Sequence, residues 1–176
     1  MLFKPVTLLL AASAAFLGNV VPVEAQVPRG TVILRDWFVD LIPTVFPNTT
    51  THWVKIFEDG TLADDIVCQF NTRTLNNKAE MRGFWTAISH QIEDRISQYV
   101  IQPKSAVAFA ADDKGREGWV IATGDTWLRT KQGRYHAGGS ASAWVSVKWD
   151  HAKKKRVITE WKEVNTPPNY PNYPWN

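Results

Sequence analysis

The second half of the chain alternates between apolar and polar residues. From Ile96 to Val164 the alternation has the two-residue period of β-strands. Three groups of turn-forming residues divide this stretch into two long hairpins, with reversals at 112–115, 131–133 and 150–155. The third strand contains Gly138 and Gly139, and glycine inside a strand is typical of a bulge or a bend. We therefore predict four antiparallel strands, one of them bent in its middle.

The first half has the three- and four-residue spacing of amphipathic helices. Apolar residues recur in this way from Thr31 to Phe46, where Pro43 is expected to bend or end the helix. A shorter helix is predicted over 51–57, and a strand over 66–74. A third helix begins after Asn76-Asn77 and keeps one apolar face as far as Ile92.

This order of elements predicts an α+β fold in which three N-terminal helices pack on a curved antiparallel sheet. Curvature of the sheet over a helical layer gives the shape of a cone. Apolar side chains are expected to point into the space between the sheet and the helices.

The first residues have the three parts of a secretory signal. Lys4 lies in a positive start, an apolar run extends from Val6 to Leu17, and the small residues Val23 and Ala25 precede Gln26. We expect cleavage after Ala25 and a secreted protein. The alternative, a membrane anchor, is disfavoured because this run is short and no second run of about 18 apolar residues follows.

The rest of the chain is long enough for one domain with a core of its own. We assign residues 1–25 to the signal peptide, 26–165 to the domain and 166–176 to a tail rich in proline and tyrosine. The tail is either a disordered extension or a strap that lies over the domain.

The formal net charge of +3 is mildly basic. The dense basic run, Lys153 to Arg156, is explained by a solvated hairpin turn, and no second basic stripe accompanies it. We therefore expect no nucleic-acid partner. The single cysteine, Cys68, has no disulfide partner in the chain and alternates with Ile66 and Phe70, which favours a buried thiol.

Three segments resemble the NTF2-like superfamily, which includes nuclear transport factor 2, ketosteroid isomerase and the SnoaL-type cyclases. Leu62 to Val67 is similar to the acidic turn into the first strand of the family. Lys78 to Ile92 resembles its third helix, and Trp144 to Val164 its closing hairpin. These motifs mark the fold and carry no catalytic signature. Among the members, the ketosteroid-isomerase-like proteins of polyketide clusters in fungi are the nearest functional analogy.

A cone pocket without a cofactor is suited to proton chemistry, because apolar walls shift the pKa of an enclosed acid or imidazole. Asp125 is the first candidate, since strand alternation places it on the same face as Trp119 and Trp127. That face is either pocket-lining or solvated. His136 is the second candidate, and the face of the sheet to which its side chain points depends on whether the glycine bulge shifts the register. Asp65 is the third candidate, because the resemblance to the NTF2-like superfamily implies that it lies near the mouth of the pocket.

The nine tryptophans are many for this length, and most are expected in the core. Trp37, Trp119, Trp127 and Trp144 are the candidates to line a pocket for a hydrophobic, ring-bearing ligand. Exposed tryptophans on the outer face of the sheet would instead form a homodimer interface. The sequence leaves both uses open.

No motif for nucleotides, dithiol redox chemistry, serine hydrolysis or zinc proteolysis occurs, and the four histidines are scattered. We therefore expect neither a cofactor nor a metal. Asn48-Thr49-Thr50 is an N-glycosylation sequon. The sequence thus predicts a secreted NTF2-like protein that binds a hydrophobic small molecule and isomerises, cyclises or dehydrates it in polyketide-type biosynthesis. The alternative is a non-catalytic secreted binding module or effector.

Overall fold

The computed structural model describes residues 26–46, 52–166 and 168. Four helical segments and six strands follow one another within these residues. The helices are α1 (Arg29–Val45), the 3-10 turn η1 (His52–Val54), α2 (Lys55–Glu58) and α3 (Lys78–Arg95). The strands are β1 (Leu62–Phe70), β2 (Arg73–Leu75), β3 (Ile96–Ala110), β4 (Gly118–Thr130), β5 (Tyr135–Asp150) and β6 (Lys155–Thr166).

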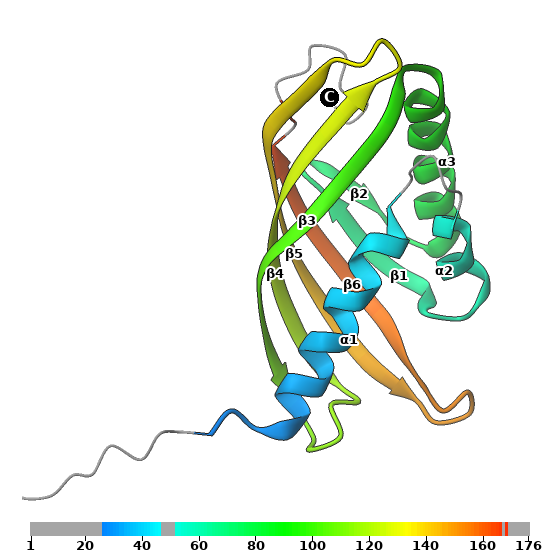
Figure 1. Ribbon diagram of the computed structural model, residues 1–176. Coiled ribbons are helices and arrows are strands. Elements are labelled where there is room, and N and C mark those ends of the chain that lie inside the picture. Colours follow the sequence, from blue (N-terminus) through cyan, green and yellow to red (C-terminus); the bar gives the residue numbers. More distant parts are fainter. Residues whose placement is uncertain (1–25, 47–51, 167, 169–176) are drawn as a thin grey trace, which may run out of the picture.

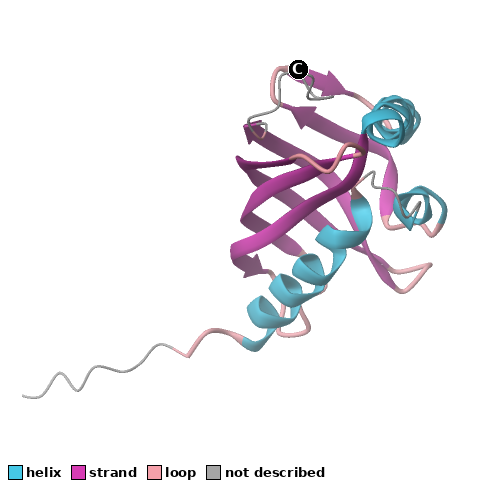
Figure 2. Cartoon of the chain, turned by 45° about the horizontal axis from the view of Figure 1, so that its top comes forward, coloured by secondary structure: helices cyan, strands magenta, loops and turns pink. Residues whose placement is uncertain are grey.

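The strands form one curved, six-stranded sheet in the order β2-β1-β6-β5-β4-β3. Strands β1 and β6 are parallel, and the other neighbours are antiparallel. The helices cover one face of this sheet, which we call the inner face, and leave the other, the outer face, bare (Figures 1 and 2). The predicted α+β architecture with its two long C-terminal hairpins is therefore confirmed.

The single strand predicted over 66–74 is wrong, because the chain reverses inside it. Strand β1 ends at Phe70, and β2 returns from Arg73 as its antiparallel partner. Asn71 lies in the left-handed region with φ of 52°. Asparagine tolerates this conformation better than most residues, so it can make a tight turn without glycine.

The glycine pair in β5 forms the predicted bulge. Thr126 of β4 lies opposite Gly139, whereas Leu128 lies opposite His136, so β5 carries one extra residue in this interval. Gly138 takes up the irregularity with φ of 87°, a conformation that side chains with a Cβ disfavour. A bulge increases the local twist and bend of a strand, which accounts for the curvature of the sheet at this end.

Aromatic side chains fill the centre of the space between the sheet and the helices. Trp85 of α3 and Trp161 of β6 are fully buried, and their ring centroids lie 6.2 Å apart. Phe38 of α1 contacts Trp161 at 5.6 Å, and Phe46, just after α1, contacts both tryptophans. The middle of the cone is thus occupied mainly by a packed aromatic core.

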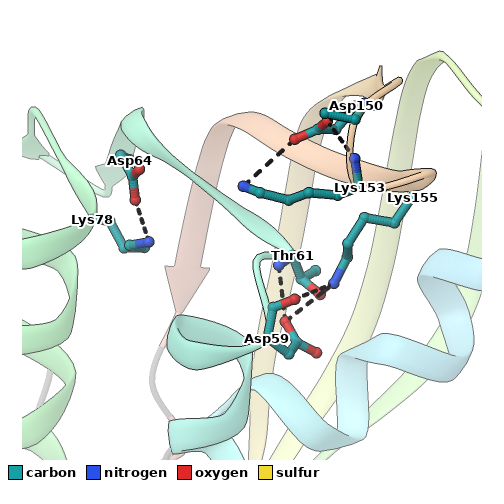
Figure 3. A network of polar contacts seen from close by, with 8 residues as sticks. Asp59, Thr61, Asp64, Lys78, Asp150, Lys153 and Lys155 are labelled. Atoms are coloured by element: carbon teal, nitrogen blue, oxygen red, sulfur yellow. Dashed lines mark hydrogen bonds and ion pairs between the residues drawn. The ribbon is translucent and has the colours of Figure 1, made fainter.

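The turn between β5 and β6 is held to the start of β1 by polar contacts (Figure 3). The ammonium of Lys155 donates to the carbonyl of Asp59 at 2.5 Å and to the Thr61 hydroxyl at 3.2 Å. Lys153 pairs with Asp150 within the turn at 3.5 Å. The basic run therefore belongs to a hairpin turn, as predicted, with part of its charge used to fix one end of the cone.

Candidate functional site

A pocket of about 340 Å³ opens at the end of the cone opposite the turn of Figure 3. Three elements form it: the turn between β1 and β2, the second half of α3, and the last residues of β6. One side is apolar and the rim is polar. The lining residues are Phe70, Asn71, Thr72, Arg73, Phe84, Ala87, Ile88, Gln91, Glu163 and Asn165.

Glu163 is the one acid among these lining residues, and its side chain points to the inner face of the sheet. The residue is only 3% exposed. One carboxyl oxygen accepts a hydrogen bond from the indole N–H of Trp161 at 3.1 Å, and the other accepts one from the Asn165 amide at 3.4 Å. Burial raises the pKa of Glu163 to about 7, although both hydrogen bonds act in the opposite direction.

Strand geometry explains how an acid comes to face the core. Residues two apart in a strand share a face, so Glu163 follows Trp161 onto the inner side while Val164 points outward and is exposed. The strand end is fixed by Asn71. Its backbone N–H donates to the Glu163 carbonyl at 2.8 Å, and its side-chain oxygen accepts from the Asn165 N–H at 2.8 Å. These bonds keep the β1–β2 turn beside Glu163.

On its other side Glu163 borders a narrow internal crevice of about 20 Å³. The crevice runs under the C-terminal part of α1 and is lined mainly by apolar groups, such as Ile42, Phe46 and Ala141. The carboxyl group thus lies between an apolar interior and a pocket with a polar rim. A carboxyl with a pKa near neutrality that faces a pocket can both accept and donate a proton there.

Asp125 does not lie in this pocket. Its side chain is 56% exposed on the outer face of the sheet and forms an ion pair with Lys104 at 2.9 Å. The predicted grouping of Asp125 with Trp119 and Trp127 on one face is correct, but that face is the solvated one. Of the two alternatives left open for this face, pocket-lining or solvated, Asp125 takes the solvated one.

His136 and Asp65 also lie apart from Glu163. His136 is half-buried and, because it pairs with the buried Leu128, faces inward at the start of β5. The bulge thus places it on the face opposite to Asp125 and Trp144, so these two candidates, Asp125 and His136, do not face one pocket. Asp65 is exposed in the first half of β1, whereas the pocket lies at the end of that strand, at Phe70.

None of the four tryptophans predicted to line a pocket is among the lining residues of this one. Trp119, Trp127 and Trp144 lie on the outer face, and Trp37 is half-buried on α1 under the guanidinium of Arg156, 5.4 Å from its ring centroid. Trp144 instead borders a shallow outer groove of about 270 Å³. The tryptophans that reach the interior near the pocket are Trp85 and Trp161.

The sequence contains one signal for Glu163. Trp161-Lys162-Glu163-Val164 alternates, but a core tryptophan on one face makes Glu163, and not Val164, the inward residue. In the part of the chain that the structure describes, no group of three histidine, cysteine, aspartate or glutamate side chains could hold a metal ion. No described helix has the length and apolar character to span a membrane. Asn48 lies outside the described residues.

The raised pKa of Glu163 predicts a pH-dependent stability. The folded state holds the proton up to about pH 7 and the unfolded chain only to about 4.5, so the free energy of unfolding is highest below 4.5 and decreases as the pH rises through 7. The full decrease is about 3 kcal/mol. Urea titrations between pH 4 and 8 should show this decrease in the wild type and not in Glu163→Gln. Glu160→Gln, a control at a half-buried residue of the same strand, should retain it, and equal pH profiles for all three proteins would contradict the assignment.

Comparisons with known proteins identify the fold. No protein-family model matches the sequence, and no curated protein is significantly similar to it. The structure of nuclear transport factor 2 from Cryptosporidium parvum is 11% identical, with a TM-score of 0.54 over 76% of this chain and 92% of that chain. A putative aromatic ring hydroxylase from Novosphingobium aromaticivorans is 14% identical, with a TM-score of 0.54 over 85% and 96%. The chain therefore has the fold of the NTF2-like superfamily.

Proposed function

We propose that this protein binds a hydrophobic, ring-bearing small molecule in the pocket at Glu163 and transfers protons there without a cofactor. The observation that carries the proposal is the carboxyl group of Glu163, a residue that is only 3% exposed and lines a pocket of about 340 Å³. Its pKa of about 7 leaves it available as base or acid near neutrality. The reactions we propose are isomerisation, cyclisation or dehydration of a polyketide-type compound.

In the mechanism proposed here, each of these reactions begins with removal of a proton from a carbon next to a carbonyl group. The Glu163 carboxylate would take this proton, while the N–H groups of Trp161 and Asn165 hold the carboxylate in place. The side-chain amide of Gln91 lines the same pocket and is available to donate to the enolate oxygen that forms. In an isomerisation the protonated Glu163 then returns the proton to another carbon of the enolate.

Exchange of the acidic protons of 2-tetralone in heavy water, followed by NMR, tests this chemistry. The wild type should accelerate exchange above the buffer rate, and the acceleration should grow as the pH rises through about 7, because the base is the ionised Glu163. Glu163→Gln should reduce the acceleration by about 100-fold or more. Asp125→Asn removes a carboxylate from the outer face and should leave the rate unchanged. Exchange by Glu163→Gln at the wild-type rate would refute the role of Glu163.

The second candidate is a non-catalytic secreted binding module or effector. It is favoured by the tryptophans that fill the centre of the core and by the aromatic side chains on the outer face. The same experiment separates the two candidates. A wild-type protein that binds naphthyl compounds in the pocket but gives no exchange above buffer would be a binding module.

We also propose that the outer face binds a second copy of the chain. Val107 and Phe109 of β3 lie opposite Ile121 and Trp119 of β4, and these four side chains are 44–57% exposed. Monomers rarely expose a contiguous apolar patch of this kind, and a two-fold axis through it would bury the patch against itself. Beyond the patch, this face carries both positive and negative side chains, such as Lys104 and Asp125. Two copies related by a two-fold axis could therefore pair opposite charges around the patch.

Light scattering with size-exclusion chromatography at micromolar concentration should give the mass of a dimer for the wild type. Trp119→Lys should give a monomer, because the interface would then bury two unpaired ammonium groups. Arg129→Ala, on the exposed outer side of β4 away from the patch, should remain dimeric. A monomeric wild type would refute the interface.

Export is the last part of the proposal. Residues 1–25 would be removed as a signal peptide and Asn48 would carry an N-linked glycan, two features outside the described residues. The protein recovered from the medium of a eukaryotic host should begin at Gln26 and lose mass on treatment with an endoglycosidase. An intracellular product that begins at Met1 would contradict this part.

A further inference from the structure

Arg73 is a cation at the rim of the pocket. It is exposed, and its guanidinium carbon lies 4.7 Å from the ring centroid of Phe84, which also lines the pocket. In the described part of the chain, no carboxylate forms an ion pair with Arg73. Stacking on an aromatic ring fixes the plane of the guanidinium and leaves its N–H edge available for a planar acceptor.

The strand register relates Arg73 to Glu163. Arg73 of β2 lies opposite Phe70 of β1, and Phe70 lies beside Glu163 of β6. Residues that are opposite in neighbouring strands share a face, so all three point to the inner side of the sheet. Neighbouring strands are about 4.8 Å apart, which puts the Cα atoms of Arg73 and Glu163 about 10 Å apart. The row Arg73-Phe70-Glu163 thus presents a cation, an aromatic ring and a proton-transferring carboxyl group in that order.

The other polar side chains around the pocket are neutral at every pH of interest. They belong to Asn71, Thr72, Gln91 and Asn165. Arg73 is therefore the one permanent charge among the described lining residues, and Glu163 is the one lining group that titrates near neutrality. Because the two lie at opposite ends of the row, an anion bound at Arg73 would be kept away from the Glu163 carboxylate.

We propose that Arg73 selects ligands with an ionised carboxylate, so that the substrate class of the pocket is a ring-bearing carboxylic acid. This inference rests on the proposed binding function of the pocket. The carboxylate of the ligand would accept two N–H bonds from the guanidinium, its ring would cover Phe70, and its reacting carbon would lie at Glu163. Phe84 and Ile88 of α3 would contact the other side of the ring.

A matched pair of probes tests the selection. 2-Naphthoate and 2-naphthamide have nearly the same shape, and only the first is charged. Isothermal titration at pH 6, where Glu163 is mainly protonated, should give at least about 10-fold tighter binding of 2-naphthoate to the wild type. Arg73→Gln should bind the two probes equally, with the affinity for 2-naphthamide unchanged.

Two further variants keep the test specific. Arg73→Lys retains the charge without the planar pair of donors and should show an intermediate preference. Arg129→Gln removes an exposed cation elsewhere and should behave as the wild type. Equal binding of both probes by the wild type, or an undiminished preference in Arg73→Gln, would overturn anion selection and leave the binding pocket in place. Binding of neither probe would overturn the proposed function of the pocket itself.

Discussion

The contact between Trp161 and Trp85 is the interaction on which the rest of this structure depends. Trp161 comes from the middle of β6 and Trp85 from α3, and both are fully buried. Phe38 of α1 packs on Trp161 at 5.6 Å, so one side chain of the sheet contacts both long helices. Burial of large aromatic surfaces is a strong non-directional force, and edge-on ring contacts add orientation to it. The position of the helices over the inner face follows from this contact.

The same tryptophan determines the chemistry of the pocket. Because Trp161 and Trp85 occupy the centre of the cone, space for a ligand remains at the open end beyond them. Glu163 lies two residues after Trp161 and accepts a hydrogen bond from its indole N–H. The central core residue, Trp161, and the proposed proton-transferring residue, Glu163, therefore lie in the same segment of β6. The carboxyl group is buried because the ring beside it must be buried, and its raised pKa is a consequence of that burial.

The two faces of the sheet have separate uses. The inner face carries the core and the row Arg73-Phe70-Glu163, whereas the outer face carries Trp119 and its apolar neighbours. The bulge at Gly138 contributes to this division, because it reverses the facing of β5 between Trp144 and His136. Residues that look equivalent by alternation thus reach opposite sides of the molecule.

The sequence by itself determined the order of the elements and most of the elements themselves, but not the reversal between β1 and β2. Local periodicity and turn chemistry placed α3 and the four long strands closely, and the glycine pair marked the bulge, because these signals depend on neighbours in the chain. Only the tertiary structure decided which face of each strand is buried. Asp125 and Glu163 both alternate with tryptophan in a strand, yet the helices cover the face of Glu163 and leave Asp125 in solvent. Alternation separates the residues of a strand into two faces but does not tell which face is buried. That depends on the long-range packing of α1 and α3 against Trp161.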